Sequence, residues 1–384
     1  MISRFLVFLG LTILIVLVVE NNDKSLILHS TIGEKIKIDG SILLNRESAI
    51  TRSIKRVSPS VVGINVTQLR KGNTKFLWDS FFPPYSHTYK VDNLGSGVIM
   101  SKDGYVITNA HVVEDADQII VTLNGGDRFE AKLIGIDNLT DVALLKIDGQ
   151  DLPFADLGNS DNLMVGEWAI ALGNPLGLFD ISHTPTATAG IISGVDVDFG
   201  LKEEGHVYQD MIQTDASINS GNSGGPLVNT LGHVIGINTF ILTGSDYLSG
   251  SIGIGFSIPI NRVKEVVDDL KLYGKVERSY NTGIYVQEID KYIQKYLRLP
   301  DPVGVLVRDV EKKSSGYRSG LQIGDVILKV DGRTVRTPKD IIRVIDEGFR
   351  KVGDIVKLTV WRNESILELL LELEESKLKK WGFK

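Results

Sequence analysis

The sequence predicts a mainly β protein with two domains, and three observations lead to this fold class. First, from Val57 to about Ile258, short apolar runs rich in β-branched residues alternate with glycines and polar turns, which is typical of a β-sandwich or β-barrel. Second, a helical pattern and then a shorter series of strands follow, which indicates a small α+β domain. Third, the 384 residues include 39 glycines and only 11 prolines, as expected for many turns, and this length allows two or three domains.

The N-terminal segment Phe5–Val19 is apolar apart from Gly10 and Thr12, and Arg4 precedes it. A positive start and an apolar run are typical of a membrane anchor or a signal peptide. As a helix the segment spans roughly 22 Å, which is short against a hydrocarbon core of about 30 Å. However, small residues suited to cleavage do not follow it, since the first alanine is Ala49. We therefore favour an uncleaved anchor over a cleaved signal, and either of these over a buried core helix.

Runs of strand length recur through the first domain, each bounded by glycine or polar residues. The clearest of them are Val61–Val66, Gly97–Met100, Tyr105–Thr108, Ile119–Leu123, Val142–Ile147, Trp168–Leu172 and Val234–Phe240. Longer polar or proline-containing stretches at residues 70–90, 196–207 and 243–251 predict loops.

One amphipathic helix is predicted to close the first domain. Its apolar residues have the i, i+3, i+4, i+7 spacing of a single helical face, at Val263, Val266, Val267 and Leu270. Asn261 is placed to cap the start of this helix, and Gly274 is placed to end it.

The second domain has the pattern of a small α+β fold. Its strands are predicted near Gly283–Gln287, Gly304–Asp309, Leu321–Val330, Ile355–Trp361 and Ile366–Leu373. Its one clear helix begins at Thr337 and Pro338, because a capping residue followed by proline in the first turn is typical of a helix start.

Composition excludes several classes of function. Lysine and arginine number 42 against 48 acidic residues, a formal net charge of −6, whereas nucleic-acid binders usually have a basic balance. The absence of cysteine excludes disulfide scaffolds, zinc–cysteine sites, thiol catalysis and lipid attachment through cysteine. The sequence also has no visible cluster of metal ligands, so we expect neither a metal nor a cofactor, and no nucleic-acid partner.

Three segments supply a histidine, an aspartate and a serine in that order along the chain. His111 lies in TNAHVV directly after a predicted strand, Asp141 lies in DNLTDVALLK where a turn enters a strand, and Ser223 lies in GNSGGPL before another strand. Acyl transfer by serine needs a hydroxyl nucleophile, an imidazole that takes and returns its proton, and a carboxylate that fixes the imidazole tautomer. The three residues therefore predict a catalytic triad.

The glycines around Ser223 predict an oxyanion hole, since glycine permits the turn that aims backbone N–H groups at one point. We assign Gly221, Asn222 and Ser223 to it, with the N–H groups of Gly221 and Ser223 as the pair of donors.

Each of these residues also has a purely structural interpretation. A lone histidine after a strand is usually only a polar residue, an aspartate in a turn is usually a cap, and a glycine-rich stretch is often a flexible loop. Asp137 is a nearby alternative to Asp141, but Asp141 directly precedes the apolar strand and so is better placed for burial beside a histidine. The joint occurrence of the three motifs in one order favours catalysis over these separate interpretations.

On these motifs the chain resembles the HtrA/Deg family of trypsin-like serine proteases. The resemblance runs from about Ile54 to Glu374 and rests on the segments TNAHVV, DVALLKI, AIALGNPLG, TAGIISG, QTDASINSGNSGGPL and GIGFSIP. It implies a chymotrypsin-like domain of two six-stranded β-barrels followed by one PDZ domain. It also gives His111 the role of general base, Asp141 that of orienting acid and Ser223 that of nucleophile. Ser220 departs from the proline or arginine common before this glycine in the family.

The implied organisation has five parts. They are a membrane anchor or signal segment at residues 1–20, a linker at 21–46, the protease domain at 47–274, the PDZ domain at 275–376 and a basic tail at 377–384.

The resemblance also indicates a substrate pocket. Ile218 is similar to a pocket-wall position, with core packing as the alternative, and the strand that includes Ile237, Asn238 and Thr239 resembles the wall that pairs with the substrate backbone. Ser217 stands six positions before the nucleophile, where a trypsin-like preference for lysine or arginine would need an acidic residue. A small or medium apolar side chain is therefore expected at the P1 position of the substrate.

The second domain resembles a PDZ module, which binds a C-terminal peptide as an added strand beside a helix. The expected peptide-binding residues are Thr282, Gly283, Ile284, Val286, Ile341 and Ile345. Thr282 replaces the hydrophobic residue that usually precedes the glycine in this family.

The resemblance implies an ATP-independent serine endopeptidase of the bacterial cell envelope, on the periplasmic side of the inner membrane and tethered by Phe5–Val19. It implies a homotrimer that cleaves misfolded or regulatory membrane and periplasmic proteins, with a PDZ domain that senses exposed C-termini. Loops at 173–180, 196–207, 216–222 and 241–250 are expected to rearrange between inactive and active states. The alternatives are a broad-specificity periplasmic degrading protease and chaperone, a chaperone alone, and a non-catalytic peptide-binding module.

Overall fold

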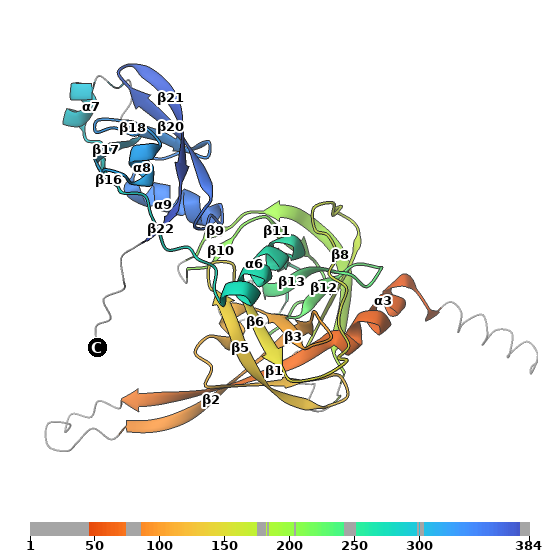
Figure 1. Cartoon of the computed structure of the whole chain (residues 1–384). Coiled ribbons are helices and arrows are strands. Elements are labelled where there is room, and N and C mark those ends of the chain that lie inside the picture. The colour runs from red at the N-terminus through yellow and green to blue at the C-terminus, as the bar shows by residue number, and fades with distance from the viewer. Residues whose placement is uncertain are drawn as a thin grey trace, which may run out of the picture. The chain divides into compact units, whose positions relative to one another are not determined.

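The structure is a computed structural model, and it describes residues 46–73, 86–174, 182, 184–202, 205–241, 251–297, 299 and 303–376 (Figure 1). The chain divides into two units, Met1–Arg52 and Ser53–Lys384, and both domains discussed below belong to the second unit. The predicted anchor Phe5–Val19 and the basic tail at 377–384 lie outside the described residues. Within the described ranges, no helix is long and apolar enough to cross a membrane.

Six antiparallel strands close into a first barrel, in the order β1-β2-β3-β6-β5-β4. They follow helix α3 (Ala49–Val57) and the short turn η1 (Ser58–Ser60), and comprise β1 (Val61–Asn73), β2 (Ser86–Ile99), β3 (Tyr105–Thr108), β4 (Gln118–Thr122), β5 (Arg128–Asp137) and β6 (Val142–Ile147). Because β1 pairs with both β2 and β4, the sheet closes on itself. Branched aliphatic side chains such as Ile64, Ile99 and Leu145 fill the interior and have no exposed surface.

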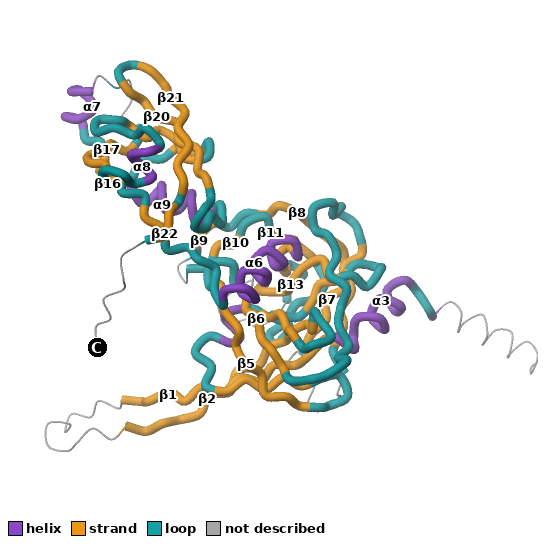
Figure 2. Tube along the Cα trace, viewed as in Figure 1, coloured by secondary structure: helices purple, strands orange, loops and turns teal. Residues whose placement is uncertain are grey.

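A second closed barrel follows, in the order β11-β14-β13-β12-β7-β8. Its strands are β7 (Trp168–Gly173), β8 (Thr186–Val197), β11 (Met211–Thr214), β12 (Pro226–Val228), β13 (Val234–Ile241) and β14 (Gly255–Pro259). The small hairpin of β9 (Gly200–Leu201) and β10 (Val207–Tyr208) lies between β8 and β11 in the chain. Strands and loops make up most of the described chain, as Figure 2 shows.

The predicted strands coincide with observed strands, and Tyr105–Thr108 and Val142–Ile147 match β3 and β6 to the residue. The prediction of a loop over residues 70–90 is wrong at both ends, since β1 continues to Asn73 and β2 starts at Ser86. The polar residues there pair in an unbroken antiparallel register with the opposite strand, so the backbone ladder extends the hairpin without an apolar pattern.

Helix α6 (Ile260–Tyr273) follows the second barrel and packs against both barrels, with contacts to β13 and β14 and to β5 and β6 (Figure 1). Gly274 ends it with a left-handed φ of 73°, as the sequence predicts. The prediction of Asn261 as the cap is wrong, because Pro259 occupies that position and the helix begins directly where β14 ends. Asn261 instead donates through its side chain to Asn159 at 2.6 Å.

The second domain is a sheet with β16, β17, β18, β20 and β21 in spatial order. Its elements are β15 (Tyr280–Asn281), β16 (Ile284–Glu288), α7 (Lys291–Leu297), β17 (Val305–Val310), α8 (Ser315–Arg318), β18 (Val326–Val330), β19 (Arg333–Thr334), α9 (Pro338–Glu347), β20 (Ile355–Arg362), β21 (Ser365–Glu372) and β22 (Glu374–Glu375). Helix α9 begins as predicted, with a capping box in which Thr337 and Asp340 each bond the other's backbone N–H.

Gly135 on β5 is a position where the fold depends on the absence of a side chain. A Cβ there would lie 2.3 Å from the carbonyl oxygen of Gly274, at the end of α6. We expect Gly135→Ala to lower the free energy of unfolding by about 1–3 kcal/mol through overpacking, measured by denaturant unfolding. Gly194→Ala on β8 is the matched control, because its nearest neighbour is a flexible glutamine side chain at 3.2 Å. Equal stability of the two variants would contradict this account of how α6 docks.

Candidate active site

His111 lies on the short helix α4 (Ala110–Val113), which follows β3 in the first barrel. The backbone around it is bonded to Asp141, since His111 N–H donates to Asp141 Oδ1 at 3.1 Å and Ala110 N–H donates to the Asp141 carbonyl at 3.2 Å. Buried Asn109 donates through Nδ2 to the same carbonyl at 2.9 Å. The histidine side chain keeps 37% of its surface exposed, so a bound molecule can reach its ring.

Asp141 is fully buried at the turn between β5 and β6, where its backbone has a left-handed φ of 56°. Its carboxylate oxygens lie 2.9 and 2.8 Å from His111 Nδ1, and Thr239 Oγ1 on β13 donates to Oδ2 at 2.7 Å. Burial by itself would raise the pKa of Asp141, but the hydrogen bonds and charge of His111, together with the Thr239 hydroxyl, hold that pKa below its ordinary value. The carboxylate is therefore ionised at neutral pH.

The ionised carboxylate determines which imidazole tautomer is present. An ionised carboxylate only accepts hydrogen bonds, so His111 Nδ1 must carry the proton that lies between the two side chains. His111 Nε2 is then the nitrogen that can take up a proton. The hydrogen bond to the histidine is made by Asp141, and Asp137 contacts a different cation, so the choice between these two residues is resolved by geometry.

Ser223 comes from the second barrel, in the loop before β12. Its side chain is partly exposed, and Oγ donates to the carbonyl oxygen of Thr239 at 2.9 Å. Thr239 thus contacts two site residues, since its own hydroxyl is bonded to Asp141. The structure bonds His111 to Asp141 and connects Ser223 to Asp141 through Thr239, where the two barrels meet.

The loop before Ser223 presents two backbone N–H groups. Gly221 has a φ of 93°, and among the described residues the N–H groups of Gly221 and Ser223 have no hydrogen-bond acceptor. The N–H of Asn222, the residue between them, donates to the Asn219 carbonyl at 2.9 Å inside the loop. The arrangement leaves the pair at Gly221 and Ser223 for an oxyanion.

The residues that sequence placed on the pocket wall are buried in the second barrel. Ile218 packs in the barrel core, and Ile237 has no exposed surface. Asn238 is also fully buried, where Nδ2 donates to the Pro226 carbonyl at 3.2 Å and Oδ1 accepts from a neighbouring serine. Thr239 is committed to Asp141. The polar side-chain groups of Asn238 and Thr239 are thus used within the protein, and the expectation that this strand pairs through its backbone with the substrate stays a prediction.

The residues that sequence assigned to peptide binding lie on and beside β16 and on α9 of the PDZ-like domain. Strand β16 pairs with β17 and stands at the end of the described sheet order, and Ile284, Val286, Ile341 and Ile345 pack into the core between β16 and α9. Gly283 has a φ of 64°, and a Cβ there would lie 2.3 Å from a serine side chain, so glycine is required.

The backbone of the loop before β16 is already partly bonded. Thr282 accepts at its carbonyl from Gly316 N–H at 2.9 Å. The N–H of Gly283 donates to the Asn281 side chain at 3.0 Å, so a terminal carboxylate must displace Asn281 or use the neighbouring N–H groups.

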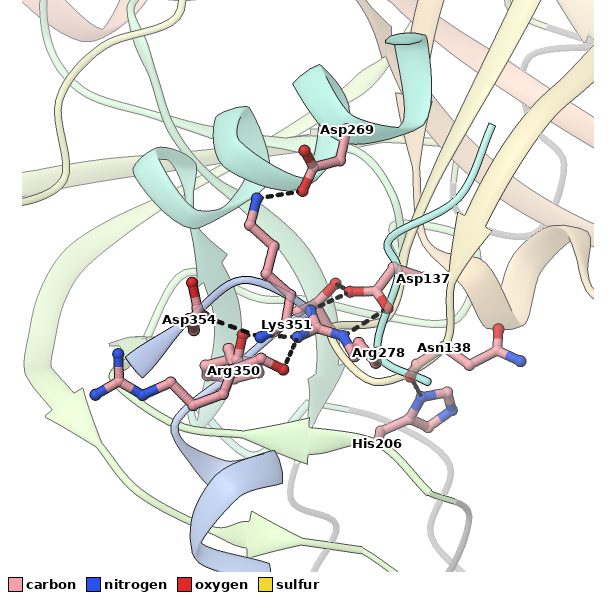
Figure 3. A network of polar contacts seen from close by, with 10 residues as sticks. Asp137, Asn138, His206, Asp269, Arg278, Arg350, Lys351 and Asp354 are labelled. Atoms are coloured by element: carbon pink, nitrogen blue, oxygen red, sulfur yellow. Dashed lines mark hydrogen bonds and ion pairs between the residues drawn. The ribbon is translucent and has the colours of Figure 1, made fainter. Parts of the chain in front are cut away.

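A buried ion pair joins the site to the second domain (Figure 3). Arg278 Nε and Nη2 donate to the two oxygens of Asp137, four residues before Asp141, at 3.2 and 2.8 Å. Arg278 Nη1 donates to the carbonyls of Phe349 and Arg350, just after α9, at 2.6 and 3.2 Å. One guanidinium group therefore holds the turn that carries Asp141 and a loop of the PDZ-like domain.

Further contacts lie on both sides of this ion pair. Lys351 Nζ donates to Asp269 of α6 at 2.5 Å (Figure 3). On the other side of the turn, His206 Nδ1 lies 2.5 Å from the Asn138 carbonyl and Val207 N–H donates to the Leu139 carbonyl at 2.7 Å. Helix α9 also contacts strands β9 and β10. The turn that presents Asp141 is thus hydrogen-bonded on one side by Arg278 and on the other by residues of the β9–β10 hairpin.

Comparison with known proteins agrees with this geometry. Family models match residues 95–237 as a trypsin-like peptidase domain and residues 252–373 as a PDZ domain. A probable periplasmic serine endoprotease, DegP-like, from Pseudomonas fluorescens is 39% identical over 335 residues, which cover 82% of this chain and 67% of the relative. The chain belongs to the HtrA family of trypsin-like serine proteases.

Other HtrA proteins show the extent of the match. A DegP-like protein of Pseudomonas fulva is 45% identical over 276 residues, 72% of this chain and 54% of the relative, so the chain spans about half the length of such curated relatives. The solved HtrA-type protease AlgW with decapeptide has a TM-score of 0.62 and 35% identity, covering 86% of this chain and 100% of that one. A serine endoprotease from Yersinia pestis has a TM-score of 0.55 and 32% identity, covering 86% of this chain and 98% of that one.

Two residues of the HtrA site were not found by sequence reasoning. Thr239 was assigned to the pocket, because a threonine in an apolar strand carries no signal that it will meet Asp141 from another barrel. Arg278 lies 141 positions from Asp137 and belongs to no motif. It is identified only in the structure, by its two hydrogen bonds to the buried Asp137 carboxylate.

Thr239→Val tests the hydroxyl that joins the two barrels. Valine keeps the shape but loses the donor to Asp141, and a hydrogen bond to a charged group contributes about 1.5–3 kcal/mol. We expect the rate at which a fluorophosphonate labels Ser223 to fall by roughly 10- to 100-fold, because the variant lowers the reactivity of Ser223 rather than its access to the probe. Thr122→Val is the control, because the buried Thr122 hydroxyl has no partner among the described residues. Labelling of Thr239→Val at the wild-type rate would contradict the role of this bond.

Proposed function

We propose that the chain is an ATP-independent serine endopeptidase in which Ser223 is the nucleophile. The observation that carries this proposal is the ionised, buried Asp141, bonded at once to His111 of its own barrel and to Thr239 beside Ser223. Family membership and the trypsin-like peptidase match support the same chemistry.

The proposed mechanism assigns each group one step. The Ser223 hydroxyl turns from the Thr239 carbonyl toward His111, loses its proton to Nε2 and attacks the scissile carbonyl carbon. Asp141 stabilises the imidazolium that results, and the N–H groups of Gly221 and Ser223 donate to the oxyanion. His111 then protonates the leaving amine as the C–N bond breaks, which leaves an acyl-enzyme. Water activated by His111 hydrolyses that ester and restores Ser223.

Substrate preference follows from what the site lacks. Ser217 stands where an acidic residue would select lysine or arginine, and the neighbouring Ile218 is apolar. We propose small or medium apolar residues at P1, in segments that are unfolded enough to lie across the site.

The second part of the proposal concerns regulation by the PDZ domain. A C-terminal peptide would add as a strand to the edge of β16, against α9. Because Arg278 bonds both the loop after α9 and the turn before Asp141, a peptide that moves this loop would change the position of the catalytic carboxylate. The AlgW structure with decapeptide supports peptide recognition in this family.

The remaining parts of the proposal rest on the sequence and on relatives. The relatives are named periplasmic proteases, which supports the periplasm, and the apolar segment Phe5–Val19 supports a tether at the inner membrane. We propose a homotrimer, by resemblance to the family, that cleaves misfolded or regulatory membrane and periplasmic proteins in response to exposed C-termini. The loops at 173–180, 196–207, 216–222 and 241–250 would rearrange on activation.

Two alternatives have distinct expectations. A broad degrading protease and chaperone would cleave many unfolded proteins without an added peptide, whereas the regulated enzyme would need one. A non-catalytic peptide-binding module would leave Ser223 unreactive toward a fluorophosphonate in every condition.

Cleavage of casein or another unfolded protein tests the catalytic proposal. We expect Ser223→Ala to abolish cleavage, a loss of at least about 10³-fold, because alanine has no hydroxyl to attack the scissile carbonyl and form the acyl-enzyme. Ser365→Ala, at an exposed serine on β21, should cleave like wild type. Undiminished cleavage by Ser223→Ala, in preparations free of other proteases, would rule out Ser223 as the nucleophile.

The Arg278→Ala variant tests the regulatory proposal. It should reduce the ratio of activities with and without a saturating C-terminal peptide toward one, while changing peptide affinity by less than about threefold, since Arg278 lies outside the groove between β16 and α9. The matched control is Arg343→Ala on α9, whose guanidinium is exposed and bonds only Asp340 of the same helix. A wild-type activation ratio in Arg278→Ala would exclude this arginine as the connection.

A further inference from the structure

Ser96 on β2 of the first barrel is buried and bonded to the loop that carries Ser223. Its hydroxyl donates to the Gly221 carbonyl at 2.5 Å and accepts from Asn174 N–H at 2.7 Å. Its backbone N–H donates to the Ser223 carbonyl at 2.8 Å. Its carbonyl accepts from Thr108 Oγ1, three residues before His111, at 2.7 Å. Every polar group of this one residue is therefore bonded to a segment of the site.

The loop from Gly221 to Gly225 is held at each peptide except where an oxyanion would bind. Asn222 N–H donates to Asn219, Gly225 N–H donates to the Asn222 carbonyl at 2.9 Å, and Gly224 N–H donates to the Asn238 carbonyl at 2.8 Å. Ser96 holds the carbonyls of Gly221 and Ser223. The N–H groups of these same two residues are the ones with no acceptor among the described residues.

The backbone of the second barrel lies very close to Ser96, at glycine positions where a side chain would not fit. A Cβ on Gly224 would lie 2.2 Å from the Ser96 carbonyl oxygen, and a Cβ on Gly173 would lie 2.8 Å from Ser96 Oγ. A Cβ on Gly225 would lie 3.1 Å from Ser96 Cβ. Three glycines thus bring the backbone of the second barrel directly against this residue of the first barrel.

We propose that Ser96 is a positioning residue for the oxyanion hole, which rests on the function proposed above. The Ser96 hydroxyl fixes the Gly221 carbonyl and with it the peptide plane between Gly221 and Asn222. The Gly221 N–H belongs to the preceding peptide plane, so Ser96 acts on it indirectly, by anchoring the backbone of Gly221 on the carbonyl side of its Cα. Ser96 does not touch substrate, and it acts through the N–H groups of Gly221 and Ser223.

The consequence is specific to the transition state. Loss of the hydroxyl leaves the buried Gly221 carbonyl without its hydrogen-bond donor. The backbone at Gly221 can then rotate toward another donor, and this rotation also changes the direction of its N–H group. An N–H turned away from the oxyanion weakens the transition state and leaves substrate binding in place, which lowers kcat with little change in KM. A role confined to folding would instead lower the melting temperature and the number of active molecules.

The test compares full-length wild type, Ser96→Ala and Ser60→Ala, using casein cleavage, thermal unfolding and the affinity of a peptide boronic acid with valine at its C-terminal position. The boronic acid forms a tetrahedral anion on Ser223 and so reports the oxyanion hole. Ser60 is a matched control, since it is equally buried and its hydroxyl donates to the Val57 carbonyl at 2.7 Å, away from the site. Active molecules are counted by fluorophosphonate labelling carried to completion.

We expect Ser96→Ala to lower kcat per active molecule by about 10- to 100-fold, below the loss of a whole donor, and to weaken boronate binding in parallel, with KM within about twofold. Ser60→Ala should keep wild-type kcat and boronate affinity. Unchanged kcat per active molecule in Ser96→Ala would overturn the proposal. It would also be overturned if Ser60→Ala lost kcat as well, and both variants lost it in proportion to the fall in their melting temperatures.

A second variant and the nucleophile control complete the test. If Ser96→Ala does not fold, Ser96→Cys keeps a weaker and longer donor and should show the same selective loss of kcat, while full kcat in that variant would overturn the proposal. If wild type and Ser223→Ala cleave casein equally, the proposed protease function fails and Ser96 has no oxyanion to serve. Ser223-dependent cleavage with an unaffected Ser96→Ala sinks only the positioning role.

Discussion

A single carboxylate of the first barrel, bonded by a hydroxyl of the second, is the contact on which the site depends. Asp141 is buried with both oxygens engaged: His111 Nδ1 lies 2.9 Å from Oδ1 and 2.8 Å from Oδ2, and Thr239 donates to Oδ2 at 2.7 Å. An ionised group without water is stable only if it is hydrogen-bonded throughout. The two barrels must therefore meet in one register for Asp141 to be stable, and in that register Ser223 is bonded to Thr239, the residue that bonds Asp141. Stability and chemistry are coupled through this one group.

The same requirement explains the polar and glycine-rich contacts around the site. Ser96 of the first barrel bonds the loop that carries Ser223, and Thr239 of the second barrel bonds Asp141, so that the two barrels are joined by directional bonds rather than by apolar area alone. Thr108 and Asn238 support these contacts from within their own barrels. Gly224 permits this approach, since any side chain there would meet the Ser96 carbonyl at 2.2 Å. Directional contacts tolerate little displacement, which suits a site whose donors must stay within about 0.5 Å of the productive geometry.

The turn that carries Asp141 is also where Arg278 connects the first domain to the second by hydrogen bonds. Arg278 is 16% exposed and Asp137 is 6% exposed in their side chains, so the pair is nearly out of water. Removing one member of such a pair is costly because the other charge stays buried. A contact of this kind is well suited to couple a peptide-binding domain to a catalytic turn, since small displacements change it in an all-or-none way.

Sequence reasoning reached the parts of this site whose signals are local. His111, Asp141 and Ser223 stand in short motifs beside strands, and β3 and β6 were placed to the residue because their apolar runs are bounded by turns. Burial beside a strand also separated Asp141 from Asp137. The roles of Thr239, Arg278 and Ser96 arise from contacts between distant segments, which leave no periodic pattern in the sequence. Asn261 was misassigned as a helix cap because α6 begins directly after β14, with Pro259 in the capping position.

The most direct measurement is a crystal structure of the full chain with a valine-terminated peptide boronic acid. The account predicts a covalent bond from Ser223 Oγ to boron, one boronate oxygen within about 3 Å of the backbone nitrogens of both Gly221 and Ser223, and the Ser96 hydroxyl still bonded to the Gly221 carbonyl. A boronate bound elsewhere, or one on Ser223 whose oxygens point away from both nitrogens, would contradict it.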